Sequence, residues 1–120
     1  MKARNFVVKV CGVAVSCLFM AQASFANFGC SGKVSMLAVD SAAAVFVAIN
    51  GGPIHSICNL DARAGYSFVP SGCKAAYATL LAAKTADKTV SISYGGDAYT
   101  CSSIPAWAVM TSAYFVDGPY

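Results

Sequence analysis

Residues 44–60, AVFVAINGGPIHSICNL, place two apolar stretches on either side of a strong turn signal. Residues 44–50 alternate as a strand does, with one face carrying Val45, Val47 and Ile49. Gly51-Gly52-Pro53 favours a turn, because glycine accepts positive φ and proline cannot continue a strand ladder. Residues 54–60 then predict a further strand, antiparallel to the first.

On the N-terminal side, residues 33–39 predict a strand joined to residues 44–50 by a short turn at Asp40 and Ser41, which completes a three-stranded antiparallel meander. On the C-terminal side, the period changes to that of a helix from Gly72, with Ser71 as a plausible N-cap. The helix stripe is expected to contain Cys73, Tyr77, Leu80, Leu81 and Lys84.

Strand alternation returns at residues 89–94, and a turn at Gly95-Gly96-Asp97 precedes a predicted short strand at 98–101 and a last strand at 106–116. The predicted order is strand, strand, strand, helix, strand, strand. This order is that of an OB-fold, a small closed barrel, and a helix-packed open antiparallel sheet has much the same order. The expected fold class is therefore mainly β with one α-helix, an OB-fold-like small barrel.

The first 26 residues have the features of a secretory signal peptide. A basic start (Lys2, Arg4 and Lys9) precedes an apolar run, and Ser24-Phe25-Ala26 supplies small residues at a cleavage site. The apolar run is short for a membrane span. We expect cleavage near Ala26, a single domain over residues 27–120 with no membrane span, and a secreted or periplasmic location.

Removal of this segment leaves five basic and five acidic side chains, so the mature net charge is zero. A neutral domain without a basic cluster lacks the electrostatic footprint of a nucleic-acid-binding protein. The unusually apolar composition, 58% over the whole chain, predicts that part of the surface faces another subunit or a partner. We expect a homo-oligomer, with the alanine-rich helix face opposite Leu80 near the contact.

The mature region contains four cysteines: Cys30, Cys58, Cys73 and Cys101. An even number in an oxidising compartment favours two disulfides. A zinc site is the alternative, but the spacing lacks a close Cys-Cys pair and His55 is the single histidine. Four cysteines allow three pairings, of which we favour Cys58–Cys73 with Cys30–Cys101.

The sequence predicts no catalytic site, metal or cofactor. His55 and Ser56 are neighbours on a strand and should point to opposite faces, so His55 is expected to be a surface or half-buried strand residue. The five Asp residues are scattered and there is no Glu, which argues against a glycosidase carboxylate pair.

Aromatic side chains are the best candidates for a binding surface. Tyr66, Tyr99 and Tyr120 lie in expected loops or at the terminus, where binding residues tend to occur. Trp107, after Ile104-Pro105, is expected to plug one end of the core.

The sequence over residues 58–107 resembles known families. The relevant parts are Cys58-Asn59-Leu60, the helix from Cys73 to Ala83, residues 88–94, and Cys101 with Ile104-Pro105-Ala106-Trp107. These parts resemble small exported proteins of Gram-negative bacteria and, more distantly, the receptor-binding B subunits of pentameric toxins of the subtilase cytotoxin and pertussis-like groups. The resemblance covers roughly the last two thirds of the mature chain. It implies an OB-fold, assembly into a ring and binding of cell-surface glycans, and no sugar-binding residue is carried over from it.

The expected function is that of an exported, non-enzymatic binding or assembly subunit that recognises a cell-surface glycan or protein. The alternative is a secreted or periplasmic structural accessory protein without a ligand. A small hydrolase that uses His55 is a third hypothesis.

Overall fold

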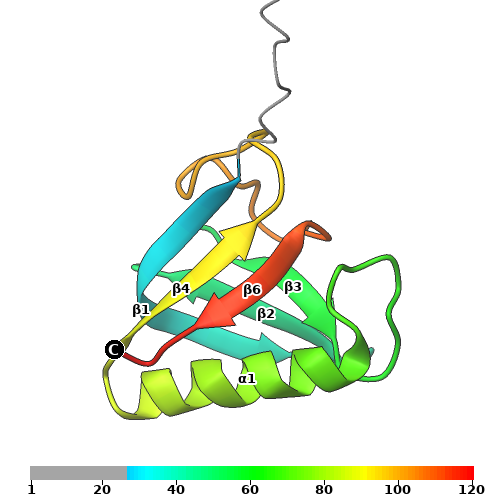
Figure 1. Ribbon diagram of the computed structural model, residues 1–120, viewed down its shortest axis with the longest axis horizontal. Helices are drawn as coiled ribbons and strands as arrows, with labels where there is room; N and C mark the ends of the chain where they lie inside the picture. Colours follow the sequence, from blue (N-terminus) through cyan, green and yellow to red (C-terminus); the bar gives the residue numbers. More distant parts are fainter. Residues whose placement is uncertain (1–26) are drawn as a thin grey trace, which may run out of the picture.

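The computed structural model describes residues 27–120, so the predicted signal segment lies outside the described part. Within residues 27–120 the chain folds into six strands and one helix (Figure 1). These elements are β1 (Phe28–Val39), β2 (Ala44–Ile49), β3 (His55–Asn59), α1 (Pro70–Thr85), β4 (Thr89–Tyr94), β5 (Ala108–Val109) and β6 (Ala113–Asp117). The prediction of a mainly β fold, with a helix between the third and fourth strands, is confirmed.

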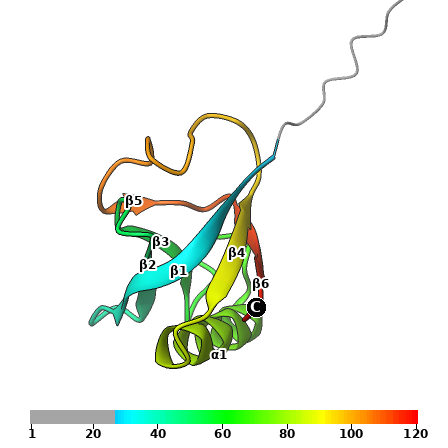
Figure 2. The ribbon, with the colours of Figure 1, turned by 90° about the vertical axis from the view of Figure 1, so that its left-hand side faces the viewer.

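The six strands form one mixed sheet in the order β5-β3-β2-β1-β4-β6. Strand β1 serves both halves of this sheet, because residues 28–33 pair antiparallel with β4 and residues 34–39 pair antiparallel with β2. At the two ends of the order, β5 pairs in parallel with β3, and β6 pairs antiparallel with β4. Since only residues 110–112 separate β5 from β6, the two ends lie close together and the sheet curves around a central core (Figure 2).

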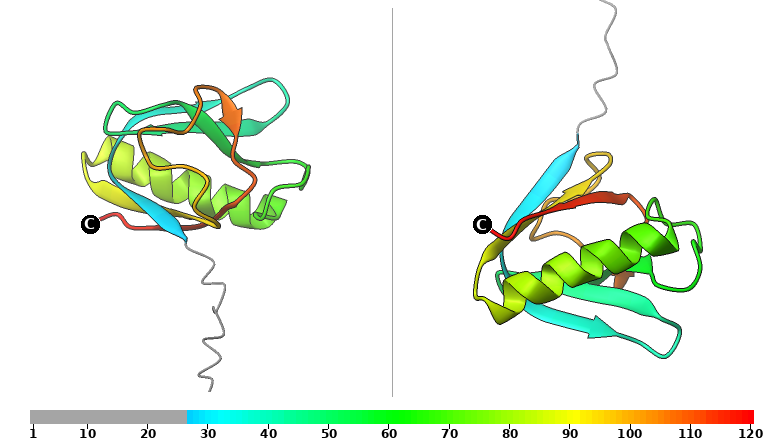
Figure 3. Two further views of the ribbon diagram at one scale, coloured as in Figure 1. Left: turned by 90° about the horizontal axis from the view of Figure 1, so that it is seen from above. Right: turned by 60° about the horizontal axis from the view of Figure 1, so that its bottom comes forward.

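Alternating side chains of the strands fill this core. Val45 and Val47 of β2 are fully buried, as are Val90, Ile92 and Tyr94 of β4. The sequence grouped Val45 and Val47 with Ile49 on one face of β2, but Ile49 is only half-buried and Ala48, from the other face, is buried. Helix α1 lies across one end of the curved sheet, between its β4–β6 half and its β1–β2–β3 half (Figure 3).

Helix α1 starts earlier than predicted and buries a different face. It begins at Pro70, with Val69 rather than Ser71 at the N-cap, since proline at the first helical position loses no helical hydrogen bond. Leu80 is fully buried, but Leu81 is 45% exposed, so its predicted place in the core is wrong. The buried stripe instead consists of Cys73, Ala76, Leu80 and Ala83.

Two disulfides hold the fold in the favoured pairing. Cys58–Cys73 joins β3 to the first turn of α1, and this bond turns Cys73 and its helical neighbours toward the sheet. Cys30–Cys101 joins β1 to the segment between β4 and β5, across a sequence separation of 71 residues. In both pairs the Cα atoms are 5.6 Å apart, which is the usual spacing for a disulfide.

The C-terminal third differs most from the sequence prediction. Residues 98–101 form no strand, and the expected strand over 106–116 is divided into β5 and β6. The division arises because the chain changes its pairing partner from β3 to β4 at residues 110–112. Trp107 does not plug the core: its side chain is 64% exposed, whereas Ile104 is buried.

Candidate functional site

Residues 95–107 cross the end of the curved sheet opposite α1 (Figure 2). We call this segment the 95–107 loop and the end that it covers the loop end. The Cys30–Cys101 disulfide and the buried side chain of Ile104 fix its middle. Its C-terminal part is held by Trp107, whose backbone N–H donates to the Ile54 carbonyl at 2.6 Å. The loop is therefore held against the end of the sheet and covers the side chains there.

A first cavity of about 200 Å³ opens at the loop end beside the Cys30–Cys101 disulfide. Ile49 and Pro53 add to its apolar wall. Polar groups come from Ser31, Asn50, Gly52, His55 and Ser102. Pockets for drug-sized ligands usually have volumes of about 300–1,000 Å³, so this cavity suits a ligand the size of a single ring.

A second cavity of about 220 Å³ lies at the same end, lined by another part of the 95–107 loop. Two aromatic side chains line it, Phe28 of β1 and Tyr99 of the loop. The remaining lining residues are small, apolar or hydroxyl-bearing: Gly95, Ala98, Val109, Met110, Thr111 and Ser112. Of the residues described, 27–120, no Lys, Arg, Asp or Glu lines either cavity.

A row of three aromatic rings connects the linings of the two cavities. Phe28, from the second cavity, stacks on Tyr94 with ring centroids 4.7 Å apart. His55, from the first cavity, is the second neighbour of Tyr94, with its ring centroid 5.6 Å from that of Tyr94. Tyr94 itself is fully buried, so its ring lies in the core between those of Phe28 and His55.

The hydrogen bonds of His55 define its tautomer. The Pro53 carbonyl can only accept, so His55 Nδ1 carries the proton and donates to it at 2.9 Å. His55 Nε2 is then free of hydrogen and accepts from the Tyr94 hydroxyl at 2.5 Å. Both ring nitrogens are occupied, and the neutral imidazole satisfies both partners.

Burial keeps both groups of this pair uncharged. Desolvation lowers the pKa of His55, although its hydrogen bond to the Pro53 carbonyl acts in the opposite direction. Desolvation also raises the pKa of the Tyr94 hydroxyl. The first cavity is therefore uncharged at neutral pH, including its one titratable side chain.

Asn50 shapes the opposite wall of the first cavity. Its side-chain oxygen accepts from the Lys33 backbone N–H at 3.0 Å, and its amide nitrogen donates to the Ser31 carbonyl at 3.2 Å. The Asn50 amide lies directly over Gly32, where a Cβ atom would overlap it, and Gly32 has a φ of +154°. A glycine at this position of β1 therefore permits the amide to lie flat against the strand.

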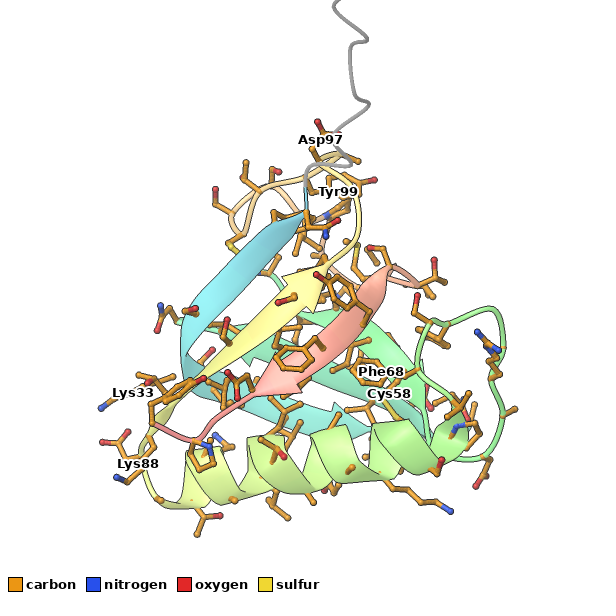
Figure 4. The ribbon with its side chains drawn as sticks, viewed as in Figure 1. Lys33, Cys58, Phe68, Lys88, Asp97 and Tyr99 are labelled. Carbon is orange, nitrogen blue, oxygen red and sulfur yellow. A yellow bond between two sulfur atoms is a disulfide. The ribbon has the colours of Figure 1, made fainter. Side chains whose placement is uncertain are left out.

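The three predicted surface tyrosines do not form one site. Tyr66 is 5% exposed, and its hydroxyl forms a 2.6 Å hydrogen bond with Ser56, so it belongs to the interior. Its predicted role on a binding surface is wrong because the loop folds back over β3. Tyr99 lies in the 95–107 loop (Figure 4). It is 37% exposed and lines the second cavity. Tyr120 is 64% exposed, and its backbone N–H donates to Thr89, at the opposite end of β4.

The prediction for His55 was wrong in one respect and right in another. His55 is 3% exposed rather than a surface or half-buried residue, because it faces the core next to Tyr94. Its neighbour Ser56 bonds Tyr66 and not the imidazole, as the strand geometry predicted. The whole of β3 is buried, with the 61–69 segment covering its outer side, and no alternating pattern in the sequence signals this.

An exposed apolar surface lies outside the loop end. Trp107 contacts Phe46 edge-on, with ring centroids 5.6 Å apart, and it has a positive φ of 65°. A bulky residue rarely adopts this conformation. Val109 is 59% exposed nearby on β5.

Comparison with protein-family models, with curated proteins and with solved structures found no match. Within residues 27–120, no helix has the length and apolar character needed to cross a bilayer. Over the same residues, no group of three or more His, Cys, Asp or Glu side chains lies close enough to hold a metal ion. The two disulfides are typical of proteins in oxidising compartments.

Proposed function

We propose that this protein is an exported, non-enzymatic binding subunit whose first cavity holds a neutral sugar ring of a cell-surface glycan. The observation that carries the proposal is an uncharged cavity of single-ring size at the loop end of a curved sheet. A sugar ring has apolar faces and a rim of hydroxyl groups. Apolar walls from Ile49, Pro53 and the disulfide, together with polar groups of Ser31 and Ser102, offer both kinds of contact.

The absence of charge favours a neutral ligand over an acidic sugar. A carboxylate that enters a cavity without a cationic partner loses its hydration without compensation. Within residues 27–120, the lining of the first cavity contains no Lys or Arg, and the pKa of His55 is lowered, which keeps this side chain uncharged. We therefore expect glycans with a neutral terminal ring to bind better than sialylated ones.

The strand order supports the proposal that the fold is an OB-like barrel. In that arrangement β5 and β6 together act as the fifth strand, since one pairs with β3 and the other with β4. Strand β1 pairs with both β2 and β4, which completes the circuit, and α1 covers one end. Ligands commonly bind in the mouths of β-barrels, and the loop end is the mouth of this one.

Two observations favour binding over catalysis. Both ring nitrogens of His55 are occupied by Pro53 and Tyr94, so the imidazole has no free nitrogen to act as a base. The neighbouring Ser56 hydroxyl is buried against Tyr66.

The proposal also includes export, with cleavage near Ala26, and assembly into a homo-oligomer that multiplies weak sugar sites. The alternative is a secreted or periplasmic structural accessory protein without a ligand.

A glycan array tests the function directly. The mature protein, residues 27–120, should bind a set of neutral glycans and show no preference for their sialylated forms. The variant Ser102→Phe places a ring at the first cavity and should lower the array signal by at least about tenfold, which corresponds to 1.4 kcal/mol. The control Ser41→Phe adds the same ring at an exposed position in the β1–β2 turn and should bind as the parent protein does.

Three results would contradict the proposal. They are the absence of binding to any neutral glycan, a strict requirement for sialic acid, and equal binding by the Ser102→Phe variant and the parent. The first of these would favour the accessory-protein alternative.

A further inference from the structure

We infer that the second cavity is a second subsite for the same ligand, so that the protein binds a chain of at least two linked neutral sugar rings. The inference rests on the proposed function of the first cavity. The two cavities are similar in size, at about 200 Å³ and 220 Å³, and each suits one ring. Within residues 27–120 the linings of both are uncharged, so they fit the same chemical class of ligand.

The two cavities are close neighbours along two segments of the chain. On β1, Phe28 lines the second cavity and Cys30 lines the first. On the 95–107 loop, Tyr99 lines the second cavity and Cys101 lines the first. On strand β1, residues two positions apart such as Phe28 and Cys30 are separated by about 7 Å, which is comparable with the spacing of linked sugar rings.

The aromatic row gives the two subsites a common base. Phe28, Tyr94 and His55 follow one another at centroid distances of 4.7 and 5.6 Å, from one cavity to the other. In the second cavity, Tyr99 and Phe28 supply aromatic surface for stacking on a sugar ring. Thr111 and Ser112 supply polar groups for its rim. A monosaccharide would use only one of these two sets of contacts.

A length series of sugars tests the inference. The probes are the mono-, di- and trisaccharide fragments of the neutral glycan that gives the strongest array signal, titrated by calorimetry against the mature protein. The disaccharide should bind at least about tenfold more tightly than the monosaccharide, because the second ring binds without a second loss of translational freedom. The trisaccharide should add little.

A pair of exposed tyrosines provides the variant and its control. Tyr99→Ala should reduce the affinity for the disaccharide to about that of the monosaccharide and should lower the affinity for the monosaccharide much less. Tyr120→Ala removes a more exposed aromatic ring at the opposite end of β4 and should change neither affinity.

Each other outcome has a definite meaning. Equal affinities for mono- and disaccharide would overturn the second subsite and leave the proposed function in place. Equal loss of both affinities in Tyr99→Ala would overturn it as well, since the second cavity would then not act separately. If no neutral glycan binds, both the inference and the proposed function fail.

Discussion

At the scale of single residues, His55 contributes to stability only while it is neutral. Its Nδ1–H donates to the Pro53 carbonyl and its Nε2 accepts from the Tyr94 hydroxyl. A second proton on the ring would occupy Nε2, which could then no longer accept the hydrogen bond from the Tyr94 hydroxyl. It would also place a positive charge in the buried interior. The folded state therefore resists protonation of this histidine.

This residue gives the stability of the fold a defined pH dependence. The pKa of His55 is lowered from its ordinary 6.5 by burial, so the unfolded chain binds the proton more readily than the folded one. The contribution is fully present above pH 6.5 and is lost as the pH falls below 6.5 toward the lower pKa of the folded state. Urea unfolding should show a falling free energy of unfolding from about pH 7 to about pH 5.5, above the range of free carboxyl groups. His55→Gln should have a flatter profile, and an equally steep one would contradict the assignment.

Two adjacent leucines on α1 provide a matched comparison. Leu80 is fully buried, so Leu80→Ala should lower the free energy of unfolding by about 2–5 kcal/mol. Leu81 is 45% exposed, so Leu81→Ala should change it by no more than about 0.5 kcal/mol. Denaturant unfolding measures both, and similar losses for the two variants would show that the helix is rotated from the orientation described.

At the scale of elements, the local sequence pattern was sufficient to predict a strand where one face of that strand packs on the core. Strand β4 could be predicted residue for residue, because Val90, Ile92 and Tyr94 alternate with hydroxyl side chains. The division of the last strand could not be predicted, since it depends on the chain leaving β3 and joining β4. The face of α1 was only partly predicted, because Leu80 and Leu81 are equivalent in a periodic pattern and contacts with the sheet select between them.

The 95–107 loop is the element that should control binding. The Cys30–Cys101 disulfide attaches this loop to β1 and forms part of the first cavity. The double variant Cys30→Ser, Cys101→Ser should lose about 2–5 kcal/mol of stability but keep a β-type circular dichroism spectrum. Under conditions where that spectrum is native, sugar binding should be lost. Unchanged affinity in the folded variant would show that the loop does not shape the site.

At the scale of the whole molecule, the candidate site could not be recognised in the sequence. Its first cavity brings together Ser31, Asn50, His55 and Ser102 from four separate segments. Loop position indicated Tyr99, which lines the second cavity, but the same criterion also selected Tyr66, which the fold buries. The cysteine count, in contrast, indicated two crosslinks because pairing in an oxidising compartment depends little on local structure.

Self-association is a property of the whole surface. Residues 27–120 have a net charge of zero, and Ala75, Ala78 and Ala82 are exposed on α1, on a face suited to close contact with another copy. Light scattering of the mature protein should give the mass of a homo-oligomer, and Ala78→Arg should reduce it to the monomer mass. A monomer at tens of micromolar for the parent protein would contradict this prediction.

The most direct test of the central claim is to locate a bound sugar on the molecule. Backbone amide spectra of the mature protein should be recorded by NMR during titration with the array-positive monosaccharide. We expect the largest shifts at Asn50, Gly52, Cys101 and Ser102, around the first cavity, with little change at the exposed Trp107. Shifts centred on Trp107 and Val109, with the first cavity unaffected, would contradict the claim that this cavity is the binding site.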